Sequence, residues 1–209
     1  MKIEELLQMS LDNMNGKAIE KTFEEIANNL INNYYIKCNE KNYCFAEIEF
    51  YYYDKDRYNQ EWNEKTYPRT NKKAGQLFFH YSGVDICFDS NFANGRFGGI
   101  LIRSLYDKTS NRFIMGPLLC VNEMLNSCSD SKENILPQII YNEKINVCEI
   151  KPTERYGISY TDENPQGEPL CFYDKRLLDD NNRKNKFENA TWDYAEKKPK
   201  DITRYYHRF

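Results

Sequence analysis

Histidine and the cysteine spacings that bind metals are scarce in this sequence. It has two histidines, and none of its seven cysteines forms a Cys-x-x-Cys pair. The usual zinc arrangements therefore cannot be assembled from adjacent ligands. An odd number of cysteines, most of them among apolar or strand-like neighbours, is typical of reduced thiols in a core. We therefore expect no metal and no other cofactor.

Long apolar runs and a strong net charge are also absent. No apolar stretch approaches the roughly 20 residues that span a bilayer. The start, Met1-Lys2-Ile3-Glu4-Glu5, has an acidic helical character rather than that of a targeting signal. These features predict a cytoplasmic protein that does not bind membranes. The formal net charge of -3 gives no overall attraction to phosphate, so any nucleic-acid binding must come from a local basic surface.

The length and the apolar content fit one folded domain. The chain has 209 residues, of which 40% are hydrophobic and 15% aromatic, which is enough for a single core. Apolar spacing predicts helices within residues 1–37. From Tyr43 the period changes to two, which predicts a core of strands over residues 43–173. Residues 175–209 are rich in charge and asparagine and predict a polar carboxyl-terminal arm, so the expected fold class is a single α+β domain.

Two carboxylates occur on the first predicted strand. Glu47 and Glu49 are two residues apart, so a strand places them on one face together with Phe45 and Tyr51. Each carboxylate raises the proton affinity of the other where water is scarce, which can produce a general base. In the alternative, one glutamate pairs with a cationic side chain and the other is solvated, the commoner arrangement for an isolated Glu-x-Glu. The aromatic neighbours favour a functional site.

A charged loop and a hairpin follow this strand. Residues 54–73 carry many charges and are interrupted by Pro68, which predicts a long exposed loop. Ser82-Gly83 is expected to form the hairpin turn, with His80 opposite Asp85. This histidine and aspartate either orient the imidazole toward a ligand or form a satisfied structural pair, and the sequence leaves both open.

Further turns and elements are predicted downstream. A turn is expected at Asn94-Gly95, a strand over residues 100–105 and a short helix over residues 121–125. Later strands are expected over residues 145–150, 155–160 and 169–173.

Several short elements occur in an order that resembles the alkyladenine DNA glycosylase family, whose members flip a damaged purine and hydrolyse its glycosidic bond. Glu47-Ile48-Glu49-Phe50-Tyr51 is similar to the family's Glu-Thr-Glu-Ala-Tyr. Tyr67-Pro68-Arg69 is similar to Thr-Pro-Arg, and Ile100-Leu101-Ile102-Arg103-Ser104-Leu105 to Val-Leu-Leu-Arg-Ala-Leu. Arg155-Tyr156-Gly157-Ile158 and Pro169-Leu170-Cys171-Phe172-Tyr173 resemble the closing Arg-Val-Gly-Val and Pro-Leu-Arg-Phe-Tyr elements. The resemblance implies a curved, mainly antiparallel β core with flanking helices.

The resemblance also implies a pocket for a flipped base. Glu49 matches the catalytic base and Tyr51 the stacking aromatic, while Gln60 replaces a pocket histidine. His80 takes the place of a second stacking tyrosine, and Asp89 that of an asparagine that screens the base. Together with Asp85, beside His80, these are the expected catalytic and substrate-binding residues. The departures at three of these positions change the groups that would recognise a base.

A nucleic-acid surface is expected around the same pocket. Candidates for phosphate contacts are Arg69, Lys72, Lys73 and Arg103. Either Tyr81 or Ser82 corresponds to the family's intercalating residue at the hairpin tip.

The resemblance implies a monofunctional DNA glycosylase in base-excision repair. Its expected partner is duplex DNA with a modified base, and it is expected to be a monomer. Two alternatives stay open, a noncatalytic nucleic-acid or protein-binding module on this fold and an N-glycosidase that acts on nucleosides or nucleotides.

Overall fold

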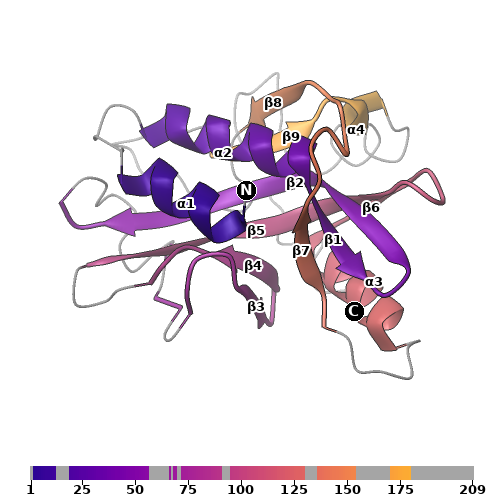
Figure 1. Cartoon of the computed structure of the whole chain (residues 1–209), viewed down its shortest axis with the longest axis horizontal. Coiled ribbons are helices and arrows are strands. Elements are labelled where there is room, and N and C mark those ends of the chain that lie inside the picture. The colour runs from indigo at the N-terminus through magenta and orange to yellow at the C-terminus, as the bar shows by residue number, and fades with distance from the viewer. Residues whose placement is uncertain are drawn as a thin grey trace, which may run out of the picture.

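The chain folds into an α+β domain in which a curved, antiparallel sheet is flanked by helices (Figure 1). This computed structural model describes residues 2–12, 19–56, 66, 68–69, 72–90, 95–129, 136–153 and 170–179. The helices are α1 (Ile3–Asp12), α2 (Ile19–Asn33), α3 (Pro117–Ser129) and α4 (Arg176–Asp179). The strands are β1 (Tyr34–Cys38), β2 (Lys41–Asp54), β3 (Leu77–His80), β4 (Gly83–Cys87), β5 (Arg96–Asp107), β6 (Arg112–Met115), β7 (Gln138–Tyr141), β8 (Ile150–Thr153) and β9 (Cys171–Asp174).

The long strand β2 is the centre of the sheet. The strand order is β3-β4-β5-β2-β1-β7, and β6 pairs with β5. One edge of β2 pairs with β5, while the other edge pairs first with β1 and then with β9, which in turn pairs with β8. Glu47 and Glu49 therefore lie on a strand with neighbours on both sides, which fixes their positions better than an edge strand would.

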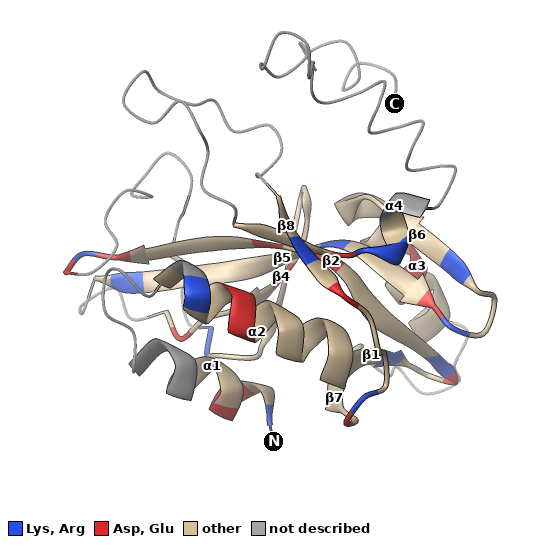
Figure 2. Ribbon diagram, turned by 90° about the horizontal axis from the view of Figure 1, so that it is seen from above, with Lys and Arg blue, Asp and Glu red and all other residues tan. Residues whose placement is uncertain are grey.

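Helices α1 and α2 cover one side of this sheet (Figure 2). Their buried residues recur at helical spacing and include Leu7, Phe23, Ile26 and Leu30. The ring of Phe23 stacks on that of Phe50 in β2, with centroids 4.6 Å apart. The apolar face of the central strands is thus occupied by the amino-terminal helices, and the carboxylates of β2 belong to the opposite face.

Two register shifts interrupt the β2–β5 pairing around Glu47. Phe45 pairs with Leu105 and Glu47 with Ser104, which makes Ala46 an extra residue of β2. Ile48 then pairs with Ile102, which makes Arg103 an extra residue of β5. A bulge adds one residue and breaks the two-residue alternation. Core positions of β2 are accordingly Tyr43 and Phe45 before the shift and Ile48, Phe50 and Tyr52 after it. Phe45 therefore packs in the core, although the alternation alone groups it with Glu47.

The elements differ from the sequence-based prediction in several places. The hairpin turn is Tyr81-Ser82, since His80 pairs with Gly83 and Phe78 with Asp85. The turn is therefore shifted by one residue toward the amino terminus relative to the prediction, and Gly83 is the first residue of β4. Gly83 packs so closely on Pro117 of α3 and on Leu101 that an added Cβ would lie within 2.9 Å of both. Residues 34–38 form a strand rather than the end of a helix. Strands β6 and β7 were not predicted, residues 145–149 form no strand, and residues 155–160 lie outside the described part of the chain.

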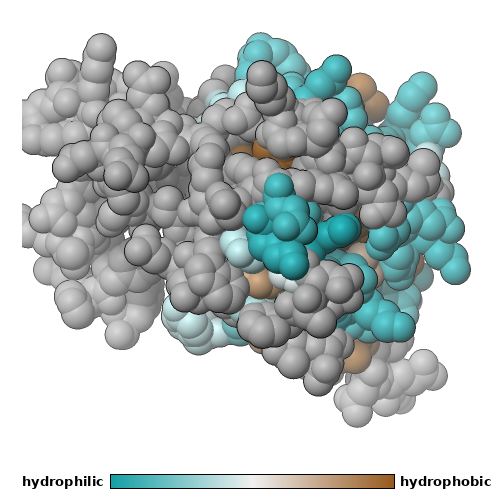
Figure 3. All heavy atoms as spheres, turned by 90° about the vertical axis from the view of Figure 1, so that its left-hand side faces the viewer, coloured by the Kyte–Doolittle hydropathy of each residue, from teal (hydrophilic) through white to brown (hydrophobic). Residues whose placement is uncertain are grey.

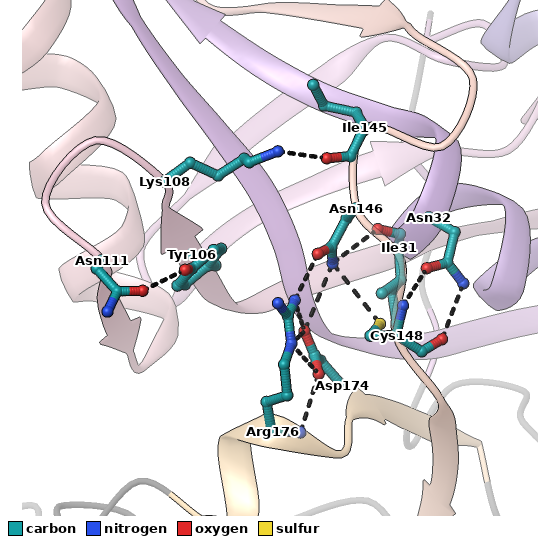
Figure 4. A network of polar contacts seen from close by, with 10 residues as sticks. All are labelled: Ile31, Asn32, Tyr106, Lys108, Asn111, Ile145, Asn146, Cys148, Asp174 and Arg176. Atoms are coloured by element: carbon teal, nitrogen blue, oxygen red, sulfur yellow. Dashed lines mark hydrogen bonds and ion pairs between the residues drawn. The ribbon is translucent and has the colours of Figure 1, made fainter.

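A polar network fastens the carboxyl-terminal strand β9 to helix α2 (Figure 4). The fully buried carboxylate of Asp174 accepts hydrogen bonds from the backbone and side chain of Arg176. Asn146 donates to Asp174 and to the carbonyl of Ile31 at the end of α2, at 3.5 and 3.2 Å. Elements more than 100 residues apart in sequence are thus joined by polar contacts in addition to the apolar packing of the core.

The described surface agrees with the polar composition. Figure 3 shows the end of the molecule at which β2 ends. Hydrophilic side chains form most of the coloured surface there. Among the described helices, none combines the length and the apolar character that crossing a membrane requires.

Candidate active site

Glu49 is completely buried and both of its carboxylate oxygens accept hydrogen bonds. The Tyr51 hydroxyl donates to Oε1, and Arg103 Nη1 donates to Oε2 over 2.6 Å. Arg103 reaches Glu49 from the extra position of the β5 bulge, which turns its side chain onto the carboxylate face. The arrangement holds one carboxylate in a fixed orientation beside a half-buried aromatic ring.

Glu47 lies next to Glu49 and shares the same arginine. Its side chain is 6% exposed and accepts a hydrogen bond from Ser104 Oγ over 2.8 Å. The Cys171 thiol donates to the other oxygen over 3.6 Å, and Arg103 Nε lies 3.6 Å from it. One guanidinium therefore faces two carboxylates, with neutral hydroxyl and thiol donors completing the shell around Glu47.

The electrostatic balance of this cluster is visible at Arg103. Burial alone would lower the pKa of Arg103, but the charges of Glu49 and Glu47 outweigh it and raise that pKa above its usual value. The guanidinium is therefore a permanent cation in the site. Arg69 and Arg103, the two arginines predicted to contact phosphates, both pair with buried carboxylates, because a buried charge needs an opposite charge.

A second buried ion pair lies on the neighbouring strand β4. Asp85 Oδ2 accepts hydrogen bonds from Nε and Nη2 of Arg69, over 2.8 and 2.6 Å, and both side chains are 2% exposed. The guanidinium lies against Gly99, the cross-strand neighbour of Tyr51, where an added Cβ would approach Arg69 Nε to 2.6 Å. Glycine at this position lets the arginine reach the strand surface beside the tyrosine.

The strand register places the two ion pairs in one row. Leu101 of β5 is the partner of Glu49 on β2 and of Asp85 on β4, and Cys171 of β9 is the other partner of Glu49. Directly paired residues share a face, so all four side chains lie on the same side of the sheet. With strands about 4.8 Å apart, the Cα atoms of Glu49 and Asp85 are roughly 10 Å apart.

His80 connects the hairpin tip to this row. Its Nδ1 lies 2.9 Å from Ser82 Oγ and 3.4 Å from the Ser82 backbone nitrogen, and its Nε2 lies 3.4 Å from Asp85 Oδ1. Its ring lies beside that of Phe78, with the two centroids 5.7 Å apart. The expected proximity of His80 and Asp85 is therefore found, but as a diagonal contact rather than as a cross-strand pair.

The remaining predicted residues lie at the surface or outside the described part of the chain. Tyr81, Ser82, Lys73 and Asp89 are exposed, and Lys72 is half-buried. Tyr81, at the hairpin tip, is 93% exposed. Gln60 is outside the described residues, so its predicted contact with a base stays a prediction.

Two site residues were missed by sequence reasoning. Cys171 was grouped with the core thiols, and Ser104 was read only as part of a strand. Their positions depend on the β2–β9 pairing and on the bulge, neither of which has a signature in a single sequence. The one available signal was Cys171 itself, which stands where the family element has arginine.

No family model and no curated protein matches this sequence. Within the described residues, no three His, Cys, Asp or Glu side chains gather as ligands for a metal ion.

Proposed function

We propose that this protein is a glycosylase of the alkyladenine DNA glycosylase type, which hydrolyses the N-glycosidic bond of a flipped, modified base. The observation that carries the proposal is the geometry of Glu49, a fully buried carboxylate bound by Tyr51 and Arg103 on the central strand. Each carboxylate oxygen has a second lone pair, so Glu49 retains the capacity to accept a hydrogen bond from a water molecule.

The proposed mechanism uses Glu49 as an ionised base. Glu49 holds a water at the anomeric carbon and takes its proton as the base departs and positive charge grows on the sugar. The same carboxylate stabilises that positive charge. Arg103, whose Nη1 lies 2.6 Å from Oε2, holds the carboxylate in a fixed orientation for this step. Tyr51 supplies an aromatic surface for the extruded base, and Tyr81 a wedge for the space it leaves.

The test is a screen of duplex and single-stranded oligonucleotides that carry different modified bases, scored for abasic sites. The wild type should form abasic sites, and Glu49→Gln should lower the rate by about 100-fold or more. Glu149→Gln is the matched control, because Glu149 is an exposed carboxylate whose partners among the described residues are two lysines. Undiminished release by Glu49→Gln would remove Glu49 from the catalytic role, and no release by the wild type would favour a noncatalytic binding module.

One observation favours a second candidate, an N-glycosidase that acts on free nucleosides. Two of the four expected phosphate-binding side chains, Arg69 and Arg103, are used in buried ion pairs. Binding of a polyanion then depends on fewer cations, whereas a nucleoside needs none. Including free nucleosides in the same screen separates the two candidates, since each predicts release from only one form of substrate.

A further inference from the structure

Two of the seven cysteines meet where strand β1 ends beside helix α3 (Figure 1). Cys38 is the last residue of β1, and Cys128 lies in the last turn of α3. Cys38 is completely buried, Cys128 is 8% exposed, and both belong to the core cluster. Their thiols form a side-chain hydrogen bond with each other, so the two sulfur atoms are in contact. Both are free thiols in this structure.

The residues next to this pair hold the two elements together. Asn39 Nδ2 donates to the carbonyl of Ser127 over 3.0 Å, and these residues are 88 positions apart in sequence. The Tyr43 hydroxyl lies 2.7 Å from Ser127 Oγ. The residues that follow Cys38 and precede Cys128 are thus hydrogen-bonded, which keeps the two thiols close without a covalent bond. A disulfide requires such proximity, because its geometry tolerates little displacement of the backbone.

Other cysteines in the described part of the chain contact different groups. Cys148 is half-buried and therefore more accessible than either member of the pair. It lies near the buried Cys44, but its sulfur accepts a hydrogen bond from Asn146 Nδ2 over 3.6 Å. Access to a dissolved oxidant therefore favours Cys148, whereas contact between two thiols favours Cys38 and Cys128.

We propose that Cys38 and Cys128 are a redox modification site, at which a peroxide converts the two thiols into a reversible disulfide that fastens α3 to β1. This inference is independent of the proposed glycosylase function. Cys128, the more exposed of the two, attacks the peroxide as a thiolate, the O–O bond breaks, and a sulfenic acid forms. The Cys38 sulfur then attacks the Cys128 sulfur and displaces the oxygen as water. In total, two thiols and one hydrogen peroxide give one disulfide and two water molecules.

The surroundings of Cys38 suit it to the second of these steps. Burial, together with the neighbouring Cys128, raises the pKa of the Cys38 thiol well above its usual value. Cys38 therefore keeps its proton until the sulfenic acid has formed, and this proton leaves with the displaced oxygen. Because a thiol reacts as its thiolate, we expect the disulfide to form over minutes to hours rather than in seconds.

Helix α3 connects this pair to the candidate active site. The N–H of Gly116, the residue before α3, donates to the carbonyl of Arg103 over 2.8 Å. Pro117, the first residue of the helix, packs against Gly83 of the hairpin. A disulfide at the other end of α3 holds the helix on which these contacts depend, and it also stabilises the fold by restricting the unfolded chain.

The test treats the full chain with hydrogen peroxide and maps its disulfides by mass spectrometry after tryptic digestion without reductant. Cys38 falls in the fragment of residues 38–41, and Cys128 in that of residues 113–132, which also contains Cys120. We expect a cross-linked pair of these fragments that is about two hydrogen masses lighter than the reduced fragments together and that separates with dithiothreitol. Sequencing of the longer fragment distinguishes Cys128 from Cys120.

Thermal unfolding measures what the disulfide does to the fold. The oxidised wild type should unfold at a temperature about 5 °C or more above that of the reduced protein. Cys128→Ala should lose both the cross-link and this increase. Cys148→Ala is the matched control, because it removes a more accessible thiol and leaves the pair intact, so it should keep both.

Three results would overturn the inference. The first is a bond between Cys44 and Cys148 in place of the predicted one. The second is a wild type in which Cys38 and Cys128 are recovered as thiols, or in which Cys128 reaches the sulfinic acid without a bond to Cys38. The third is a cross-linked protein that is no more stable than the reduced one, since the bond would then not fasten α3 in its native position. None of these measurements uses a nucleic acid, so their failure leaves the proposed function untouched.

Discussion

At the scale of single residues, the site is defined by charges that the fold has to neutralise. Glu49 is fully buried and Asp85 is 1% exposed, and each binds an arginine, of which Arg69 is buried and Arg103 is partly exposed. Buried ion pairs rarely add net stability, because desolvation offsets the attraction between the charges. Two such pairs in one row of a sheet therefore support the function proposed for Glu49.

Arg103 allows a direct measurement of this electrostatic balance. Arg103→Met keeps much of the side-chain volume but leaves Glu49 and Glu47 without their shared cation. We expect the free energy of unfolding, measured with urea, to fall by about 3–5 kcal/mol. The double variant with Glu49→Gln should recover a large part of the loss, because the uncompensated charge is then absent.

Arg112 provides the matched control for that change. Its side chain is 55% exposed and pairs with Glu123 over 3.1 Å. Arg112→Met should cost no more than about 1 kcal/mol, as is usual for exposed ion pairs. Similar losses of unfolding free energy in the two arginine variants would mean that the ion pairs of Arg103 contribute no more to stability than the exposed pair of Arg112 and Glu123.

At the scale of secondary-structure elements, the sequence predicts the types of element better than their registers. The helical spacing before residue 33 and the alternation after Tyr43 arise from burial, so they are visible in the sequence and the structure confirms them. The bulge at Glu47 is different, because it depends on how β2 and β5 fit together. Phe45 was placed on the wrong face by the prediction for this reason, whereas Glu49, beyond the bulge, was placed on the correct face.

Helix α3 carries a pH-dependent attachment to the sheet. Burial works to raise the pKa of Glu123, but hydrogen bonds from Tyr43 and Arg112 outweigh it, so the pKa is lowered overall. A lowered pKa in the folded state stabilises the fold above the unfolded pKa, and this contribution disappears as the pH falls through the folded value. We expect Glu123→Gln to be less stable than the wild type at pH 6 by about 1 kcal/mol.

The difference in the free energy of unfolding between the wild type and Glu123→Gln should shrink as the pH is lowered. Urea unfolding at pH 6, 5, 4 and 3 measures it, because both proteins have an uncharged side chain at residue 123 once the wild-type glutamate is protonated. A constant difference from pH 6 to pH 3 would show that the amide disturbs packing and that the charge of Glu123 contributes nothing.

At the scale of the whole molecule, the strand that carries the candidate site depends on contacts made by distant parts of the chain. Strand β9 supplies Cys171 beside Glu49 and Tyr173 beside Glu47, and Leu170 accepts the backbone hydrogen bond of Phe50. At its end, Asp174 connects β9 through Asn146 to helix α2. The candidate site and the network in Figure 4 therefore lie at opposite ends of the short strand β9.

Asp174→Asn tests whether this network supports the site. The substitution keeps the shape of the side chain but removes the charge that Arg176 binds, so we expect a loss of about 2 kcal/mol in the free energy of unfolding. Hydrogen exchange should quicken at the amide of Phe50, which bonds to Leu170, and remain unchanged in the β3–β4 hairpin, which has no contact with β9 in the sheet order. Glu149→Gln is the control, since this exposed carboxylate on the same segment binds Lys175 and should alter neither measurement. Faster exchange in both regions would mean that Asp174 stabilises the domain as a whole. Faster exchange confined to the Phe50 amide would show that the network specifically holds β9 against β2, the strand that carries Glu49.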